Sequence, residues 1–87
     1  MTVDAHHQIS SYQWNFDPAA SGPRWRAFPE AAYELCVYEV GDWYVFDNSI
    51  IHSSLAHGVA ASLVEGQRQV IAAFHDIKRR RTGIKPP

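Results

Sequence analysis

Strand-forming residues cluster in the middle of the chain, where residues 33–46 read YELCVYEVGDWYVF. β-branched and aromatic residues favour strands, and the Gly41–Asp42 pair between the two runs is typical of a two-residue hairpin turn, because glycine accepts a positive φ. The pattern predicts two antiparallel strands, over 33–40 and 43–47.

This turn would place Val40 opposite Trp43, and Tyr38 opposite Val45, on one face of the hairpin. The other face is also substantially apolar, and a helix can cover only one of the two. The second face must be closed by another part of the chain, by a partner or by a second copy. If the rest of the chain leaves it open, we expect a homodimer that buries these four side chains.

A second pattern, with the period of an α-helix, occupies residues 62–81. Ser62 and Glu65 have the spacing of a capping box, in which the serine hydroxyl accepts a first-turn amide and the glutamate reaches back. Glycine costs roughly 1 kcal/mol of helix propensity relative to alanine, so Gly66 predicts close approach to a bulky sheet residue such as Trp43. The predicted sheet-facing stripe consists of Leu63, Gly66, Val70, Ala73, Phe74 and Ile77.

Other positions of this helix suggest different roles. Val64, Ile71 and His75 share a flank that we interpret as a smaller apolar contact edge. Cations in the last turn suit the carbonyl end of the helix dipole, and Gly83 is predicted to end the helix. These cations are Lys78, Arg79, Arg80 and Arg81.

The remaining segments complete the predicted sheet. Residues 9–17 alternate with one aromatic face and predict a first strand, and residues 50–58 predict a short last one. Residues 18–31 contain three of the five prolines and predict a long loop with an extended piece at 25–28. We interpret Trp25 as a side chain that pins this loop to the body. The predicted fold is α+β, an antiparallel three- to five-stranded sheet with a C-terminal amphipathic helix packed on one face.

Eighty-seven residues predict a single domain over 1–87, with residues 1–8 and 83–87 flexible. The formal net charge of −1 hides an asymmetry. Residues 1–65 carry two arginines against eight carboxylates, a net charge of −6, and residues 66–87 carry six basic residues against one aspartate, a net charge of +5. The sheet half is therefore acidic and the helical tail basic.

The single cysteine, Cys36, excludes an intramolecular disulfide and favours a reducing compartment. The N-terminus lacks the basic and apolar regions of a signal peptide, and no run reaches the roughly 18 apolar residues of a membrane span. We expect a cytoplasmic protein that does not bind membranes.

Catalytic and metal-binding patterns are weak. His6 and His7 lack a fixed third ligand, so we predict no metal and no cofactor. Ser53 or Ser54 with a histidine and Asp47 has the composition of a catalytic triad but not the pattern of a nucleophile elbow. We expect no enzymatic activity, and an enzyme with a site between subunits is the third and weakest class of function.

From Trp43 onward the order W-Y-V-F, a turn, S-S-L-A-H-G-V-A-A-S-L-V-E-G and an amphipathic helix resembles a pattern in small phage and mobile-element proteins. Some type I anti-CRISPR proteins are similar in size and layout. Gly66 stands where that pattern usually has alanine. The resemblance covers about half of the chain and implies a helix packed on a sheet, in the cytoplasm of a host cell. It assigns no functional residue, because proteins of this class inhibit different targets through different surfaces.

The first hypothesis is an interaction protein that binds a basic nucleic-acid-binding site on a host effector, such as a CRISPR effector subunit. Carboxylates on a rigid sheet can occupy a cleft that otherwise binds phosphates, and complementary charge speeds encounter. The candidate contact residues are Glu34, Tyr38, Glu39, Asp42, Trp43 and Asp47.

The alternative is a nucleic-acid-binding protein that uses Lys78, Arg79, Arg80 and Arg81 at the end of the helix. Its basic cluster equally suits the helix dipole and solubility. The acidic body opposes this function, since the long-range field of the sheet half would repel a polyanion.

Overall fold

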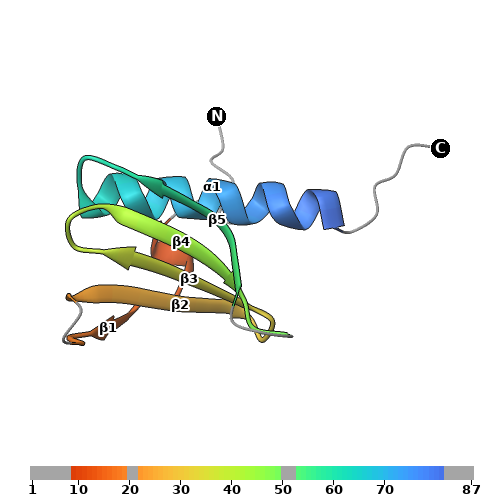
Figure 1. The fold of residues 1–87 in the computed structure, drawn as a ribbon, viewed down its shortest axis with the longest axis horizontal. Helices are drawn as coiled ribbons and strands as arrows, with labels where there is room; N and C mark the ends of the chain where they lie inside the picture. The colour runs from red at the N-terminus through yellow and green to blue at the C-terminus, as the bar shows by residue number, and fades with distance from the viewer. Residues whose placement is uncertain (1–8, 20–21, 50–52, 82–87) are drawn as a thin grey trace.

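Five antiparallel strands form one sheet in chain order, β1-β2-β3-β4-β5, and a C-terminal helix packs on one of its faces (Figure 1). The predicted α+β fold is confirmed. The computed structural model describes residues 9–19, 22–49 and 53–81. The elements are η2 (Ile9–Ser11), β1 (Asn15–Asp17), β2 (Arg24–Glu30), β3 (Tyr33–Tyr38), β4 (Asp42–Asp47), β5 (Ser53–Val59) and α1 (Leu63–Arg81).

The β3–β4 hairpin exists as predicted, but its register differs. Its connection has three residues, 39–41, and the Gly41 amide donates to the Tyr38 carbonyl over 2.9 Å. Gly41 has a φ of 113°, which suits the last position of a three-residue hairpin loop. Val37 consequently pairs with Trp43, three residues from the predicted partner. A shift by an odd number of residues moves every side chain of one strand to the opposite face relative to the other strand.

The new register places the hydrophobic core under the helix. Leu35 pairs with Val45 next to the Val37–Trp43 pair, and all four side chains are buried. The predicted dimer surface is therefore wrong, because Trp43 and Val45 face α1 within the same chain. Val40 lies in the turn and is exposed.

Helix α1 begins as predicted, with the Glu65 amide donating to the Ser62 hydroxyl over 3.2 Å. The helix contacts β3, β4, β5 and η2 (Figure 1). Its buried residues are Gly66, Gln67, Val70, Ile71 and Phe74. Ile71 is only 1% exposed and belongs to the core rather than to the predicted contact edge, whereas Val64 of the same edge is 49% exposed. The η2 segment packs beside the helix.

The helix approaches the sheet closely at Gly66, as predicted, but the neighbour of Gly66 is not Trp43. A β-carbon there would lie 2.8 Å from Val37 Cγ1 and 2.9 Å from the Gly41 carbonyl oxygen. The changed register explains the difference, because it brings Val37 beneath the first turns of the helix.

The N-terminal part of the first predicted strand is a turn instead. Residues 9–11 form the 3₁₀ turn η2, in which the Ile9 carbonyl accepts hydrogen bonds from the Tyr12 amide and from Trp14 Nε1. Ile9, Tyr12 and Trp14 all pack against the core from this segment. Only 15–17 form a strand, because the aromatic side chains are buried through the turn rather than by strand alternation.

The segment that we predicted as a long loop contains β2, which pairs with both β1 and β3. Pro29 is tolerated because it lies where the pairing with β3 is irregular, between Ala27 and Glu30. Trp25 packs against Phe16 of β1, with ring centroids 5.0 Å apart. Its packing role is confirmed, although the surrounding segment is a strand.

Strand β5 completes the sheet, and its register shifts between Val45 and Phe46 of β4. No helix in the described ranges is long and apolar enough to cross a membrane. The helix extends to Arg81, as predicted. The predictions for His6, His7, Gly83 and the two flexible termini lie outside the described residues.

Candidate functional site

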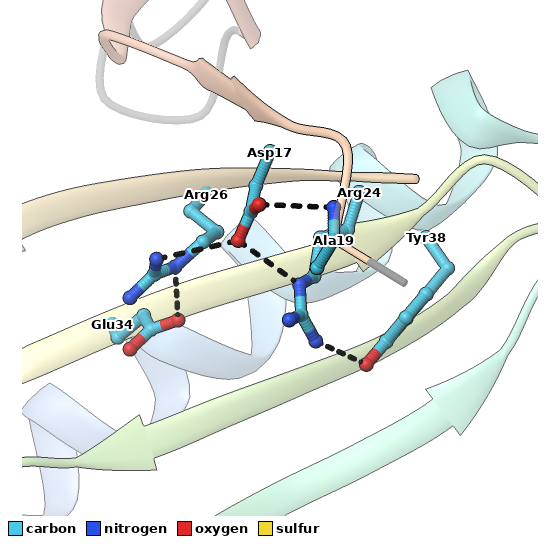
Figure 2. Close-up of polar contacts among 6 residues, drawn as sticks. All are labelled: Asp17, Ala19, Arg24, Arg26, Glu34 and Tyr38. Atoms are coloured by element: carbon cyan, nitrogen blue, oxygen red, sulfur yellow. Dashed lines mark hydrogen bonds and ion pairs between the residues drawn. The ribbon is translucent and has the colours of Figure 1, made fainter. Parts of the chain in front are cut away.

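The sheet face opposite α1 is closed by its own long side chains. Arg24 and Arg26 of β2 both approach Asp17, at 3.3 Å and 3.5 Å between their nitrogens and the carboxylate Oδ2 (Figure 2). Arg26 Nε also donates to Glu34 Oε2 over 2.8 Å. The sticks in Figure 2 lie on the side of the sheet that faces away from the helix. The open apolar face that the sequence predicts is therefore partly covered by ion pairs.

Aromatic rings continue this face across β3 and β4. Tyr44 lies at their centre, with ring centroids 6.2 Å from Tyr38, 5.6 Å from Phe46 and 6.0 Å from His57. The Tyr38 and Tyr44 rings are nearly perpendicular, at 76°. Arg24 contacts the outer ring of this group, Tyr38. Its Nη1 donates to the Tyr38 hydroxyl over 2.6 Å, and its Cζ lies 5.4 Å from the centroid of the Tyr38 ring.

At the β3–β4 turn Tyr38 and Tyr44 border an open hollow of about 430 Å³, which we call the acidic notch. Glu39 is exposed there and Asp42 is partly exposed. The notch is lined by Gly22, Pro23, Tyr38, Glu39, Val40, Asp42 and Tyr44.

The two carboxylates of the notch differ from the other acidic side chains. The described residues include eight carboxylates, and six of them form ion pairs with arginine or lysine. Glu39 and Asp42 are the two that do not. Their charges are therefore uncompensated at close range, and they give this end of the molecule a negative potential.

Exposed apolar side chains border the notch. Val40 is 73% exposed in the turn, and Val59, which pairs with Asp42 across β4 and β5, is 76% exposed. Apolar side chains beside charged ones are typical of the border between the core and the rim of a protein interface. Val40 and Val59 thus give this end of the molecule the mixed composition of such a border.

Three of the six predicted contact residues lie elsewhere. Glu34 is only 4% exposed and holds Arg26, while Trp43 is buried under the helix and donates from Nε1 to Gln69 Oε1 over 2.9 Å. Asp47 is also buried. The six therefore do not form one exposed surface. Only Tyr38, Glu39 and Asp42 meet at one place, and the register of the hairpin is the reason.

Asp47 has a structural environment of its own. Its Oδ1 accepts hydrogen bonds from the Ser49 hydroxyl and amide, and its Oδ2 lies 3.0 Å from Arg81 Nη1. Hydrogen bonding from Ser49, reinforced by Arg81, lowers the pKa of Asp47 to about 2. Asp47 thus ties the end of β4 to the end of the helix, and its partners among the described residues are Ser49 and Arg81 rather than a histidine.

The basic end of α1, the predicted surface for nucleic acid, has three carboxylates paired with its four cations, which leaves a net charge of +1. Lys78 forms an ion pair with Glu30, and Arg81 forms one with Asp47. Arg79 and Arg80 both reach Asp76, at 2.7 Å and 2.8 Å. Each of the four predicted residues thus has a carboxylate partner, which weakens the field that a polyanion would meet.

A second hollow, of about 490 Å³, lies where β2 and α1 meet the segment that follows η2. Tyr12 and His75 meet beside it, with the hydroxyl 2.9 Å from Nε2. Because this hydrogen bond joins the N-terminal segment to the helix, we assign it a structural role. Across the described part of the chain, no three His, Cys, Asp or Glu side chains lie close enough together to bind a metal ion.

Comparison of the chain with protein-family models, with curated proteins and with solved structures finds no match. Tyr44 lines the notch but is not among the predicted contact residues, and Val40 was predicted only as part of the homodimer surface. The correct hairpin register would have indicated Tyr44, because it places Tyr44 on the same face as Tyr38.

Proposed function

We propose that the protein is a non-enzymatic interaction domain whose acidic notch binds a basic site on a protein partner. The observation that carries this proposal is the pair of uncompensated carboxylates, Glu39 and Asp42, in a chain whose other described carboxylates are all paired. Paired surface charges largely cancel at a distance, so these two carboxylates dominate the approach of a cationic partner.

The surroundings of the notch supply the rest of an interface. Tyr38 and Tyr44 provide aromatic area of the kind that dominates binding energies, and Val40 adds exposed apolar surface. In such an interface the aromatic residues contribute most of the affinity, whereas the carboxylates contribute register and association rate.

The partner that we propose is the nucleic-acid-binding cleft of a host effector complex, where the carboxylates would stand in place of phosphates. The resemblance in layout to type I anti-CRISPR proteins supports this choice. It agrees with the charge of the notch, since a cleft that binds phosphates presents arginine and lysine.

A competition experiment tests this function. A purified type I CRISPR effector complex is titrated with its target DNA in the presence of the protein, and DNA affinity is measured by fluorescence anisotropy. We expect the wild-type protein to weaken DNA binding and the Glu39→Lys, Asp42→Lys double variant to lose this effect. A Glu30→Lys, Glu65→Lys double variant changes the net charge equally at residues that do not line the notch and should still compete. Unchanged DNA affinity with the wild-type protein would contradict the proposal.

The alternative function, nucleic-acid binding by the protein itself, is tested by titrating the protein alone with labelled DNA or RNA. If the basic end of α1 binds nucleic acid, affinity falls steeply with salt and is lost when Arg79 and Arg80 are replaced by glutamate. We expect no such binding, because both arginines are held by Asp76.

A further inference from the structure

The acidic notch combines two features that together specify a ligand more narrowly than charge alone. Two carboxylates, Glu39 and Asp42, lie beside two tyrosine rings that stand nearly perpendicular, at 76°. A carboxylate pair attracts any cation, and the face of an aromatic ring attracts a cation that has shed water. From this combination we infer that the notch receives one arginine side chain of the partner. This inference rests on the proposed function and names the group that the notch recognises.

The chain itself shows that this aromatic group accepts a guanidinium. Arg24 Nη1 donates to the Tyr38 hydroxyl, and its Cζ lies 5.4 Å from the centroid of the same ring. Asp17 compensates the charge of Arg24 at 3.3 Å. The notch offers the incoming side chain the same kinds of contact, an aromatic ring and a carboxylate, from Tyr44 and from Glu39 or Asp42.

The local charge balance favours a cation in spite of Arg24. The charged side chains along the helix-free face from β1 to the β3–β4 turn are two arginines and four carboxylates, a net charge of −2. Two of the carboxylates neutralise the arginines, so the remaining charge is that of Glu39 and Asp42. An anionic ligand is therefore disfavoured at this site.

Arginine fits the site better than lysine for reasons of shape and hydration. Guanidinium is planar, is weakly hydrated, stacks on aromatic rings and donates to two carboxylates at once. An ammonium group is compact and strongly hydrated, and it gains less from the open aromatic walls of the notch. A hollow of about 430 Å³ also leaves room for the aliphatic stem beside Val40 and Pro23.

The inference is tested on the full chain with the peptide Ac-Gly-Arg-Gly-NH2, followed by NMR. We expect it to shift the ring signals of Tyr38 and Tyr44. The same peptide with citrulline, a neutral isostere of arginine, should bind at least about fivefold more weakly, and a lysine peptide should bind more weakly than the arginine peptide. Equal affinity for the arginine peptide and either other peptide would overturn the inference.

Two sets of variants localise the binding. Glu39→Gln with Asp42→Asn, and separately Tyr44→Leu, should each weaken arginine-peptide binding about fivefold. Glu30→Gln with Glu65→Gln removes as much charge elsewhere and should leave the affinity within about twofold. Equal losses in the notch variants and this control would overturn the assignment to the notch, and so would shifts confined to other residues.

The outcomes separate this inference from the proposed function. Peptide binding at the notch without competition against DNA would leave the arginine site standing and remove the effector complex as partner. Competition lost in the notch variants, together with equal binding of the arginine and citrulline peptides, would retain the function and overturn the arginine site.

Discussion

The indole of Trp43 lies directly over Gly58, its cross-strand partner on β5. A β-carbon on Gly58 would lie 2.5 Å from Trp43 Cζ2, and the indole Nε1 donates to Gln69 of the helix. The missing side chain at Gly58 therefore lets one tryptophan join β4, β5 and α1.

Gly58→Ala should destabilise the fold by about 2 kcal/mol, because the whole indole must move away from the new methyl group. Urea unfolding followed by tryptophan fluorescence measures this change. With Trp43→Leu in the background the same substitution should cost at least about 1 kcal/mol less, since the clash is gone. Additive effects of the two substitutions would contradict this account.

Gly66→Ala should also destabilise the protein, although alanine is the better helix former. The gain in helix propensity is about 1 kcal/mol, and the forced separation from Val37 and Gly41 costs about 2 to 3 kcal/mol. The expected net loss is about 1 to 2 kcal/mol in chemical denaturation. Ala72→Gly, at an exposed position of the same helix, calibrates the propensity contribution. A more stable Gly66→Ala variant would show that helix and sheet are not in close contact here.

The low pKa of Asp47 predicts that the folded protein loses stability in acid. Its pKa of about 2 in the folded chain lies below the ordinary value of 3.8, so its contribution is complete above about pH 4 and is lost as the pH falls towards 2. We expect the free energy of unfolding to decline over this range. Asp47→Asn should flatten that decline, whereas Asp42→Asn should leave the contribution of Asp47 in place. An NMR titration of the Asp47 carboxyl group checks the pKa itself.

The burial of Cys36 predicts that its thiol reacts slowly with labelling reagents in the folded protein. Burial raises the pKa of the Cys36 thiol to about 11, and the negative charge of Glu34 adds to this shift. At neutral pH the thiolate fraction should fall about a hundredfold relative to an ordinary cysteine. We expect labelling by an aromatic disulfide reagent to be slow in the native protein and fast in urea. The less stable Gly58→Ala variant should react faster, because labelling then follows opening of the fold. Rapid native labelling would mean that the helix-free face is not closed over Cys36.

The helix could be predicted from local signals alone. The Ser62 cap acts within one turn, and the stripe that contains Val70 and Phe74 follows from helical periodicity, so neither depends on distant residues. The sheet could be predicted only in part. The Trp25 segment reads as a loop because of its prolines, yet β2 forms since its irregular pairing with β3 accommodates Pro29.

By itself the sequence determined that a hairpin is centred near Gly41, that a capped amphipathic helix covers a sheet, and that acidic and basic residues are segregated along the chain. The tertiary structure decided the register. A three-residue turn brings Val37 beside Trp43, and burying both under one helix gains more than the two-residue turn that local propensity favours. The tertiary structure also decided which carboxylates are left without an ion-pair partner and can bind a cation. Asp47 is paired with Arg81, 34 residues away along the chain, whereas Glu39 and Asp42 form no ion pair with a described cation. A pattern of charges along a chain does not specify such pairing, because ion pairs depend on distances that only the folded backbone sets.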